Sequence, residues 1–147
     1  HFARFVLSEF FDYTSLLFTR SEKGRRVAAA QEKMKALILK IDDLLGDQGI
    51  EFVLVVLPTE RDIELDTYEE LRNQQGLVDF CHIKGVATIE VKPYFIEQLA
   101  RGNSELGDLY WPKDFHFTPL GYRYMGEAIQ QGLCKLMHGM AQQVCSP

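Results

Sequence analysis

The run Ile50–Leu57 (IEFVLVVL) constrains the fold of this chain more than any other segment. It is almost continuously apolar and rich in β-branched residues, a composition typical of a strand that is covered on both faces in a parallel sheet. Pro58 follows it, and proline ends a strand because it has no N–H to donate to a neighbour. A strand buried on both faces needs helices to cover it, so the chain is predicted to be an α/β protein.

A second strand and a series of helices are predicted around this run. Segment 86–91 (VATIEV) has the composition of a second parallel strand, and apolar residues recur at helical spacing in most of the remaining chain. Because a helix separates the two strands, we expect them to pair in parallel through a right-handed crossover. Helices are expected at 1–23, 27–46, 66–84, 93–100 and 119–138, with helix-ending glycines at Gly46 and Gly85 and a break near Gly76.

The domain organisation follows from length and strand count. A chain of 147 residues with 46% hydrophobic content can form one domain with a sizeable core. Two strands alone do not make a stable, doubly covered sheet. We therefore expect 1–147 to be a single-domain piece of a larger sheet, completed by its parent domain or by a partner chain such as a second copy. The start at His1 instead of Met favours a piece of a longer protein, and 139–147 is expected to be a loose tail.

Charge and cysteine spacing argue against several classes of protein. A net charge of −5 without a cluster of Lys and Arg argues against a nucleic-acid binder. No run reaches the roughly 18 apolar residues of a membrane-spanning helix. Cys81, Cys134 and Cys145 match no CxxC or Cys/His metal spacing, so a zinc site is not expected. No cofactor is expected. We interpret these cysteines as two helix-packing thiols and one thiol in the tail.

The segment 109–122 (LYWPKDFHFTPLGY) places an acid and an imidazole directly before a helix start. Thr118 can cap the first turn, and Pro119 stands where a helix tolerates a missing N–H. Asp114 and His116 are therefore expected within hydrogen-bonding reach of each other, in a loop that leads into the last helix. An acid that orients a histidine base is two-thirds of a nucleophile–base–acid triad.

These features resemble a known superfamily. An apolar strand that ends in proline (FVLVVLPTERDIE) is followed by a helix, a short strand (VATIEVKPYF) and a block with Asp-x-His and a later Gly (DLYWPKDFHFTPLGYRYMGEAI). The chain is similar, over roughly residues 50 to 137, to the C-terminal half of the SGNH, or GDSL-like, hydrolases. It resembles most closely the bacterial branch with D-x-H spacing, which includes alginate O-acetylation proteins. The resemblance implies a flavodoxin-like, three-layer parallel sheet, of which this chain holds the last strands and helices.

The resemblance also implies an activity, an ester hydrolase or O-acyltransferase acting on acylated carbohydrate or small esters. His116 would be the general base and Asp114 the carboxylate that fixes its tautomer. By position in the chain, Tyr110 and Trp111 would shape the substrate pocket, and Arg61, just past the strand end, would reach an anionic or sugar substrate. The resemblance favours an extracytoplasmic location in a bacterium.

The chain departs from the superfamily at the nucleophile. The Gly-Asp-Ser block should precede residue 1, and the Gly and Asn blocks of the oxyanion hole have no match. Ser15 follows an acid in Asp12-Tyr-Thr-Ser15, but it stands in a helical pattern that forbids a nucleophile elbow. We therefore expect this chain alone to be catalytically incomplete, and inactive on simple acetyl esters.

Two other readings stay open. The chain could be a non-catalytic SGNH-like module that binds a glycan or a protein. It could also be a flavodoxin-like receiver or nucleotide-binding fold, which is disfavoured because no Gly-rich phosphate loop follows a strand.

Overall fold

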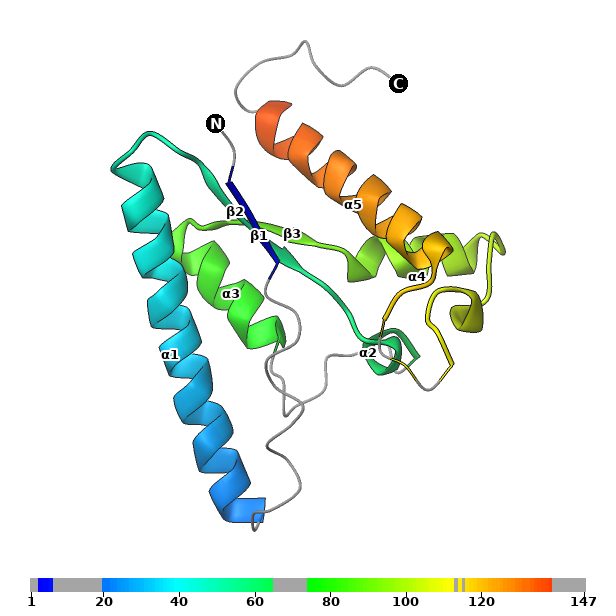
Figure 1. The fold of residues 1–147 in the computed structure, drawn as a ribbon, viewed down its shortest axis with the longest axis horizontal. Helices are drawn as coiled ribbons and strands as arrows, with labels where there is room; N and C mark the ends of the chain where they lie inside the picture. The colour runs from blue at the N-terminus through cyan, green and yellow to red at the C-terminus, as the bar shows by residue number, and fades with distance from the viewer. Residues whose placement is uncertain (1–2, 7–19, 65–73, 113, 115, 139–147) are drawn as a thin grey trace. The chain divides into compact units, whose positions relative to one another are not determined.

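The computed structural model describes residues 3–6, 20–64, 74–112, 114 and 116–138 as a mixed α/β protein (Figure 1). The chain divides into two compact units. The first consists of His1–Leu54 and Tyr68–Thr88, and the second of Val55–Thr67 and Ile89–Pro147. The boundary between them falls inside two β-strands.

The sheet contains β1 (Ala3–Val6), β2 (Phe52–Val56) and β3 (Ala87–Glu90), in the order β1-β2-β3. All residues of β2 are buried, as its apolar run predicted. The strands β2 and β3 are parallel, which confirms the predicted pairing. Just past β3, the Val91 N–H donates to the Val56 carbonyl at 3.1 Å.

The predicted N-terminal helix is wrong where the structure describes it. Ala3–Val6 is a strand beside β2, because pairing with a neighbouring strand outweighs the weak helical periodicity of this segment. Residues 7–19 lie outside the described part of the chain, and the next helix begins at Arg20.

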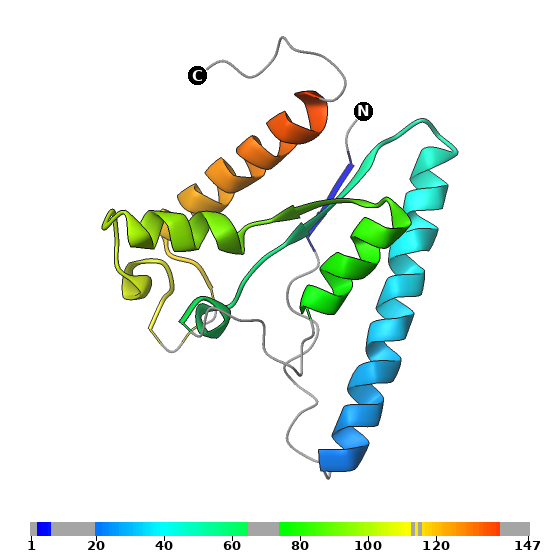
Figure 2. The same ribbon diagram turned by 180° about the vertical axis from the view of Figure 1, so that it is seen from behind.

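In the first unit, α1 (Arg20–Gly46) packs against α3 (Gln74–Lys84), and Figures 1 and 2 show the two helices side by side. Buried Ile38, Val78 and Cys81 belong to the core of this unit. The helix α3 runs through Gly76 without the predicted break, and its predicted beginning falls in residues 65–73, outside the described range.

The helix α1 ends at Gly46, as predicted, but the glycine of its C-terminal cap lies three residues later. Gly49, with a φ of 68°, takes the left-handed position that was assigned to Gly46. The Ile50 N–H donates to the Leu45 carbonyl and the Gly49 N–H to the Gly46 carbonyl, both at 2.9 Å. This pair of bonds is the Schellman motif, which closes a helix and needs a residue without a Cβ at its left-handed position.

The second unit contains α2 (Glu60–Glu64), α4 (Lys92–Ala100), the 3₁₀ helix η1 (Leu106–Asp108) and α5 (Pro119–His138). Its core is aromatic: the ring centroids of Phe95 and Phe117 lie 5.4 Å apart, and those of Phe117 and Tyr110 lie 4.9 Å apart. Both helices α4 and α5 begin at or next to the prolines that the sequence indicated. The helices predicted at 93–100 and 119–138 are therefore confirmed.

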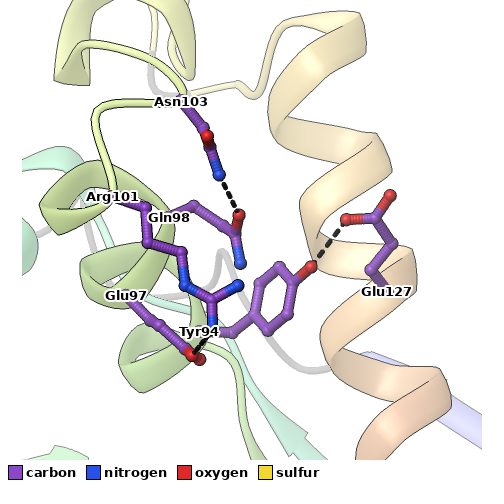
Figure 3. Close-up of polar contacts among 6 residues, drawn as sticks. All are labelled: Tyr94, Glu97, Gln98, Arg101, Asn103 and Glu127. Atoms are coloured by element: carbon purple, nitrogen blue, oxygen red, sulfur yellow. Dashed lines mark hydrogen bonds and ion pairs between the residues drawn. The ribbon is translucent and has the colours of Figure 1, made fainter.

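A hydrogen bond joins α4 to α5, and further polar contacts lie near the end of α4 (Figure 3). The Tyr94 hydroxyl of α4 donates to the Glu127 carboxylate of α5 at 2.7 Å. Near the end of α4, Arg101 pairs with Glu97, and the Asn103 amide donates to the Gln98 side chain at 2.8 Å. Burial and the Glu127 carboxylate together raise the pKa of Tyr94 to about 12, because both disfavour the tyrosinate.

The cysteines differ from one another in state. Cys81 is a free, buried thiol, and burial is the main cause that raises its pKa. Cys134 is disulfide-bonded, so its interpretation as a packing thiol is wrong, and Cys145 lies outside the described residues. Within the described ranges, no helix is both long and apolar enough to cross a membrane.

Candidate functional site

The turn that precedes α5 is a closed loop built by backbone hydrogen bonds. Tyr110 and Phe117 form an isolated antiparallel bridge at its base. Inside the bridge, the Trp111 N–H donates to the His116 carbonyl and the Asp114 N–H donates to the Trp111 carbonyl, each at 3.0 Å. The described residues from Tyr110 to Phe117 are therefore held in one tight turn, which we call the pre-α5 turn.

The pre-α5 turn leads into α5 through the cap that the sequence predicted. The Thr118 hydroxyl accepts from the Gly121 N–H at 3.2 Å and donates to the Asp108 carbonyl. The Thr118 N–H donates to the Leu109 carbonyl at 3.0 Å. An added Cβ at Gly121 would stand 2.3 Å from the Leu109 carbonyl oxygen, so only glycine lets the two segments approach this closely.

Asp114 and His116 are in contact, which confirms the predicted proximity. Asp114 Oδ1 accepts from the His116 backbone N–H at 3.1 Å and also contacts the His116 ring nitrogen Nδ1. The two side chains are 52% and 56% exposed. When Nδ1 donates its proton to the carboxylate, the acceptor lone pair of the neutral ring is at Nε2. The turn thus presents the His116 ring, in contact with a carboxylate, at the protein surface.

The other predicted site residues have different surroundings. Trp111 is half-exposed inside the pre-α5 turn, where its ring can meet a ligand. Arg61 is exposed on α2. Tyr110 is 2% exposed and its hydroxyl donates to the Pro58 carbonyl at 3.0 Å, so it lies beneath the surface, and its part in shaping a substrate pocket stays a prediction. Its ring is needed for packing against Phe117, and its hydroxyl is already bonded. Ser15 lies outside the described residues.

A second turn, between β2 and α2, was missed by the sequence reasoning. Thr59 caps α2, and the Asp62 carboxylate three residues later accepts from the Thr59 N–H and from its hydroxyl, both at 2.7 Å. The Asp62 N–H in turn donates to the Thr59 hydroxyl at 3.3 Å. This reciprocal arrangement is a capping box, and Thr-x-x-Asp directly after a strand was the available signal. We call Pro58 to Asp62 the post-β2 turn.

Tyr110 is the side chain that connects the two turns, through its bond to Pro58. Burial raises its pKa, with a further contribution from the carboxylates of Asp62 and Glu60. The hydroxyl therefore stays protonated, and remains a donor, throughout the pH range in which an enzyme works.

Among the described residues, no three His, Cys, Asp or Glu side chains gather in a cluster that could hold a metal ion. Comparison with known proteins finds no matching family model, curated protein or solved structure.

Proposed function

We propose that this chain carries the acid–base part of a serine ester hydrolase or O-acyltransferase, with an SGNH-type, flavodoxin-like fold in its parent protein. The observation that carries the proposal is the exposed His116 ring, which is paired with Asp114 through Nδ1. The substrate class would be acylated carbohydrate or small esters. The superfamily assignment itself rests on the motif resemblance.

Each residue would have a defined part in the chemistry. The Nε2 lone pair of His116 would accept the proton of a serine hydroxyl as that oxygen attacks the ester carbonyl. Asp114 would hold the tautomer and stabilise the imidazolium that forms. His116 would then return the proton to the leaving alcohol. Water would complete a hydrolysis, and a sugar hydroxyl would complete an acyl transfer.

The nucleophile would come from outside residues 1–147, and the substrate would meet Trp111 beside the pair. An exposed indole offers a flat apolar face to an acyl chain or a sugar ring. Arg61 remains the candidate for contact with an anionic or polar substituent.

The second candidate is a non-catalytic module that binds a glycan or a protein. It is favoured by the two half-exposed rings of Trp111 and Tyr122, because aromatic side chains of this exposure bind ligands without any nucleophile. The two candidates make opposite predictions about His116.

An esterase assay with a chromogenic acetyl ester separates them. In the parent protein, His116→Ala should lower kcat by about a thousandfold or more, because the members of a triad act as a unit. His82→Ala, which removes an exposed histidine from α3, is the matched control and should leave kcat unchanged. Residues 1–147 alone should show no turnover.

Three outcomes would contradict this account. A parent protein that is active but indifferent to His116→Ala places the base elsewhere. A parent protein without esterase activity, whose ligand binding depends on Trp111 but not on His116, is a binding module. Turnover by residues 1–147 alone would reveal a nucleophile inside them, with Ser15 the first residue to test.

A further inference from the structure

Tyr110 occupies an unusual place for a side chain next to a surface site. It is one of the largest fully buried residues, yet it begins the turn that exposes His116. Its ring centroid lies 4.9 Å from that of Phe117, its own bridge partner. Its hydroxyl reaches 52 residues back along the sequence to the Pro58 carbonyl.

The Pro58 carbonyl, which accepts this hydrogen bond, is held in place by its neighbours. Pro58 is buried and follows the last residue of the buried strand β2 by two positions, so its carbonyl lies close to the end of that strand. The proline ring restricts the backbone at this position, and the capping box of Thr59 and Asp62 holds the next residues. A donor attached to this carbonyl is therefore held in place from outside the pre-α5 turn.

A displacement of Tyr110 would be transmitted to His116 by two backbone contacts. Tyr110 is bridged to Phe117, the neighbour of His116, and the following residue Trp111 donates directly to the His116 carbonyl. The backbone hydrogen bonds of the turn itself, from Trp111 to His116, from Asp114 to Trp111 and from Thr118 to Leu109, join these residues to one another, whereas the Tyr110 hydroxyl joins the turn to Pro58.

We propose that Tyr110 is a positioning residue, whose hydroxyl fixes the Asp114–His116 pair relative to the carboxyl end of β2. The proposal rests on the proposed function, because it names a residue that acts through the His116 base. Tyr110 touches no substrate. It sets where the imidazole stands when the nucleophile approaches, and small errors in that position are costly: about 1 Å can cost roughly a hundredfold in rate.

Tyr110→Phe is the test, because phenylalanine keeps the ring that packs on Phe117 and removes only the hydroxyl. Tyr94→Phe is the matched control: it removes a hydrogen-bonded hydroxyl from the same unit, between α4 and α5 (Figure 3). In the parent protein, Tyr110→Phe should lower kcat about tenfold with KM within about twofold, a signature of lost transition-state positioning. Tyr94→Phe should leave both constants near wild type.

The ring tautomer of His116, read from its 15N chemical shifts in the full chain, gives a readout that needs no activity. Wild type should be mainly protonated at Nδ1, and Asp114→Asn should lose that preference. Tyr110→Phe should fall between these two, and Tyr94→Phe should match wild type. Circular dichroism of both Phe variants checks that they are folded.

The outcomes separate this proposal from the proposed function. A wild-type tautomer population together with an unchanged kcat in Tyr110→Phe overturns the positioning role and leaves the Asp114–His116 chemistry intact. An equal tautomer shift in Tyr94→Phe also overturns it, because the effect would then be general loosening of the unit. A parent protein without esterase activity contradicts the proposed function, while the difference in tautomer between the two Phe variants still decides the role of Tyr110.

Discussion

The post-β2 turn and the pre-α5 turn begin alike and end differently. Each places a threonine as the cap of the following helix, Thr59 before α2 and Thr118 before α5. In the post-β2 turn, the third helical residue is Asp62, which folds back onto its own cap and is 1% exposed. In the pre-α5 turn that position is Gly121.

The two turns differ in the partner of their carboxylate, which is a helix cap in one turn and a histidine ring in the other. The Asp62 carboxylate accepts two hydrogen bonds from Thr59, three positions earlier in the chain, and is shielded from solvent. It therefore stabilises the start of α2. Asp114 stands outside the helix cap, is half-exposed, and pairs with a titratable ring. A glycine at position 121 lets the Leu109 backbone approach the start of α5 closely.

Replacing Gly121 by Ala should have the largest effect and break the pre-α5 turn. The new methyl group would clash with the Leu109 carbonyl, and backbone cannot move aside as a side-chain end can. We expect a loss of about 3 kcal/mol in the free energy of unfolding, measured by urea denaturation.

Gly126→Ala in the same helix is the control, since a Cβ there meets nothing within 4 Å. It should be neutral or stabilise by up to about 1 kcal/mol, because alanine is the better helix former. Equal stability of the two alanine variants would show that Leu109 does not approach Gly121 as described.

Alkaline pH should have a smaller effect on stability, and it tests the two tyrosines whose hydroxyls are hydrogen-bonded, Tyr94 and Tyr110. Tyr94, which belongs to neither turn, has its pKa raised from 10.0 to about 12 by burial and Glu127. The unfolded chain therefore ionises first, so the stability contributed by Tyr94 is full below about pH 10 and is lost as the pH rises through about 12.

The pKa of Tyr110 is also raised, mainly by burial, so the same sign applies to the bond between the turns. Urea denaturation at pH 8 and pH 11 measures both effects. The difference in unfolding free energy between wild type and Tyr94→Phe should shrink at pH 11, and so should the difference for Tyr110→Phe. If these differences in unfolding free energy stay constant between pH 8 and pH 11, the two hydroxyls are not protonated, hydrogen-bonded donors as described.

Local signals in the sequence predicted much of the fold and the central pair of the site. The apolar run predicted β2, the prolines at positions 93 and 119 predicted the starts of α4 and α5, and Thr118 was recognised as a cap. The contact between Asp114 and His116 was predicted because two residues of separation in a tight turn leave few alternatives. Each of these features depends on neighbours in the sequence.

The features that were missed depend on distant partners. Ala3–Val6 is a strand because β2 is beside it, and its own periodicity carried no sign of that pairing. The bond from Tyr110 to Pro58 spans 52 residues, so nothing near Tyr110 in the sequence indicated that its hydroxyl has an internal partner. Asp62 was overlooked because a capping box in a five-residue helix is short beside the long periodic segments.

The most direct test of this account compares Asp62→Asn with Asp114→Asn by urea denaturation at neutral pH. Both changes remove one charge and keep one side-chain oxygen. Asp62→Asn should lower the free energy of unfolding by about 1–3 kcal/mol, because it disturbs buried, charge-assisted bonds to Thr59. Asp114→Asn should stay within about 0.5 kcal/mol of wild type, because its pair is exposed and asparagine still accepts from the His116 N–H. A loss of stability in Asp114→Asn as large as that in Asp62→Asn would make both carboxylates structural and contradict the proposed role of the Asp114–His116 pair.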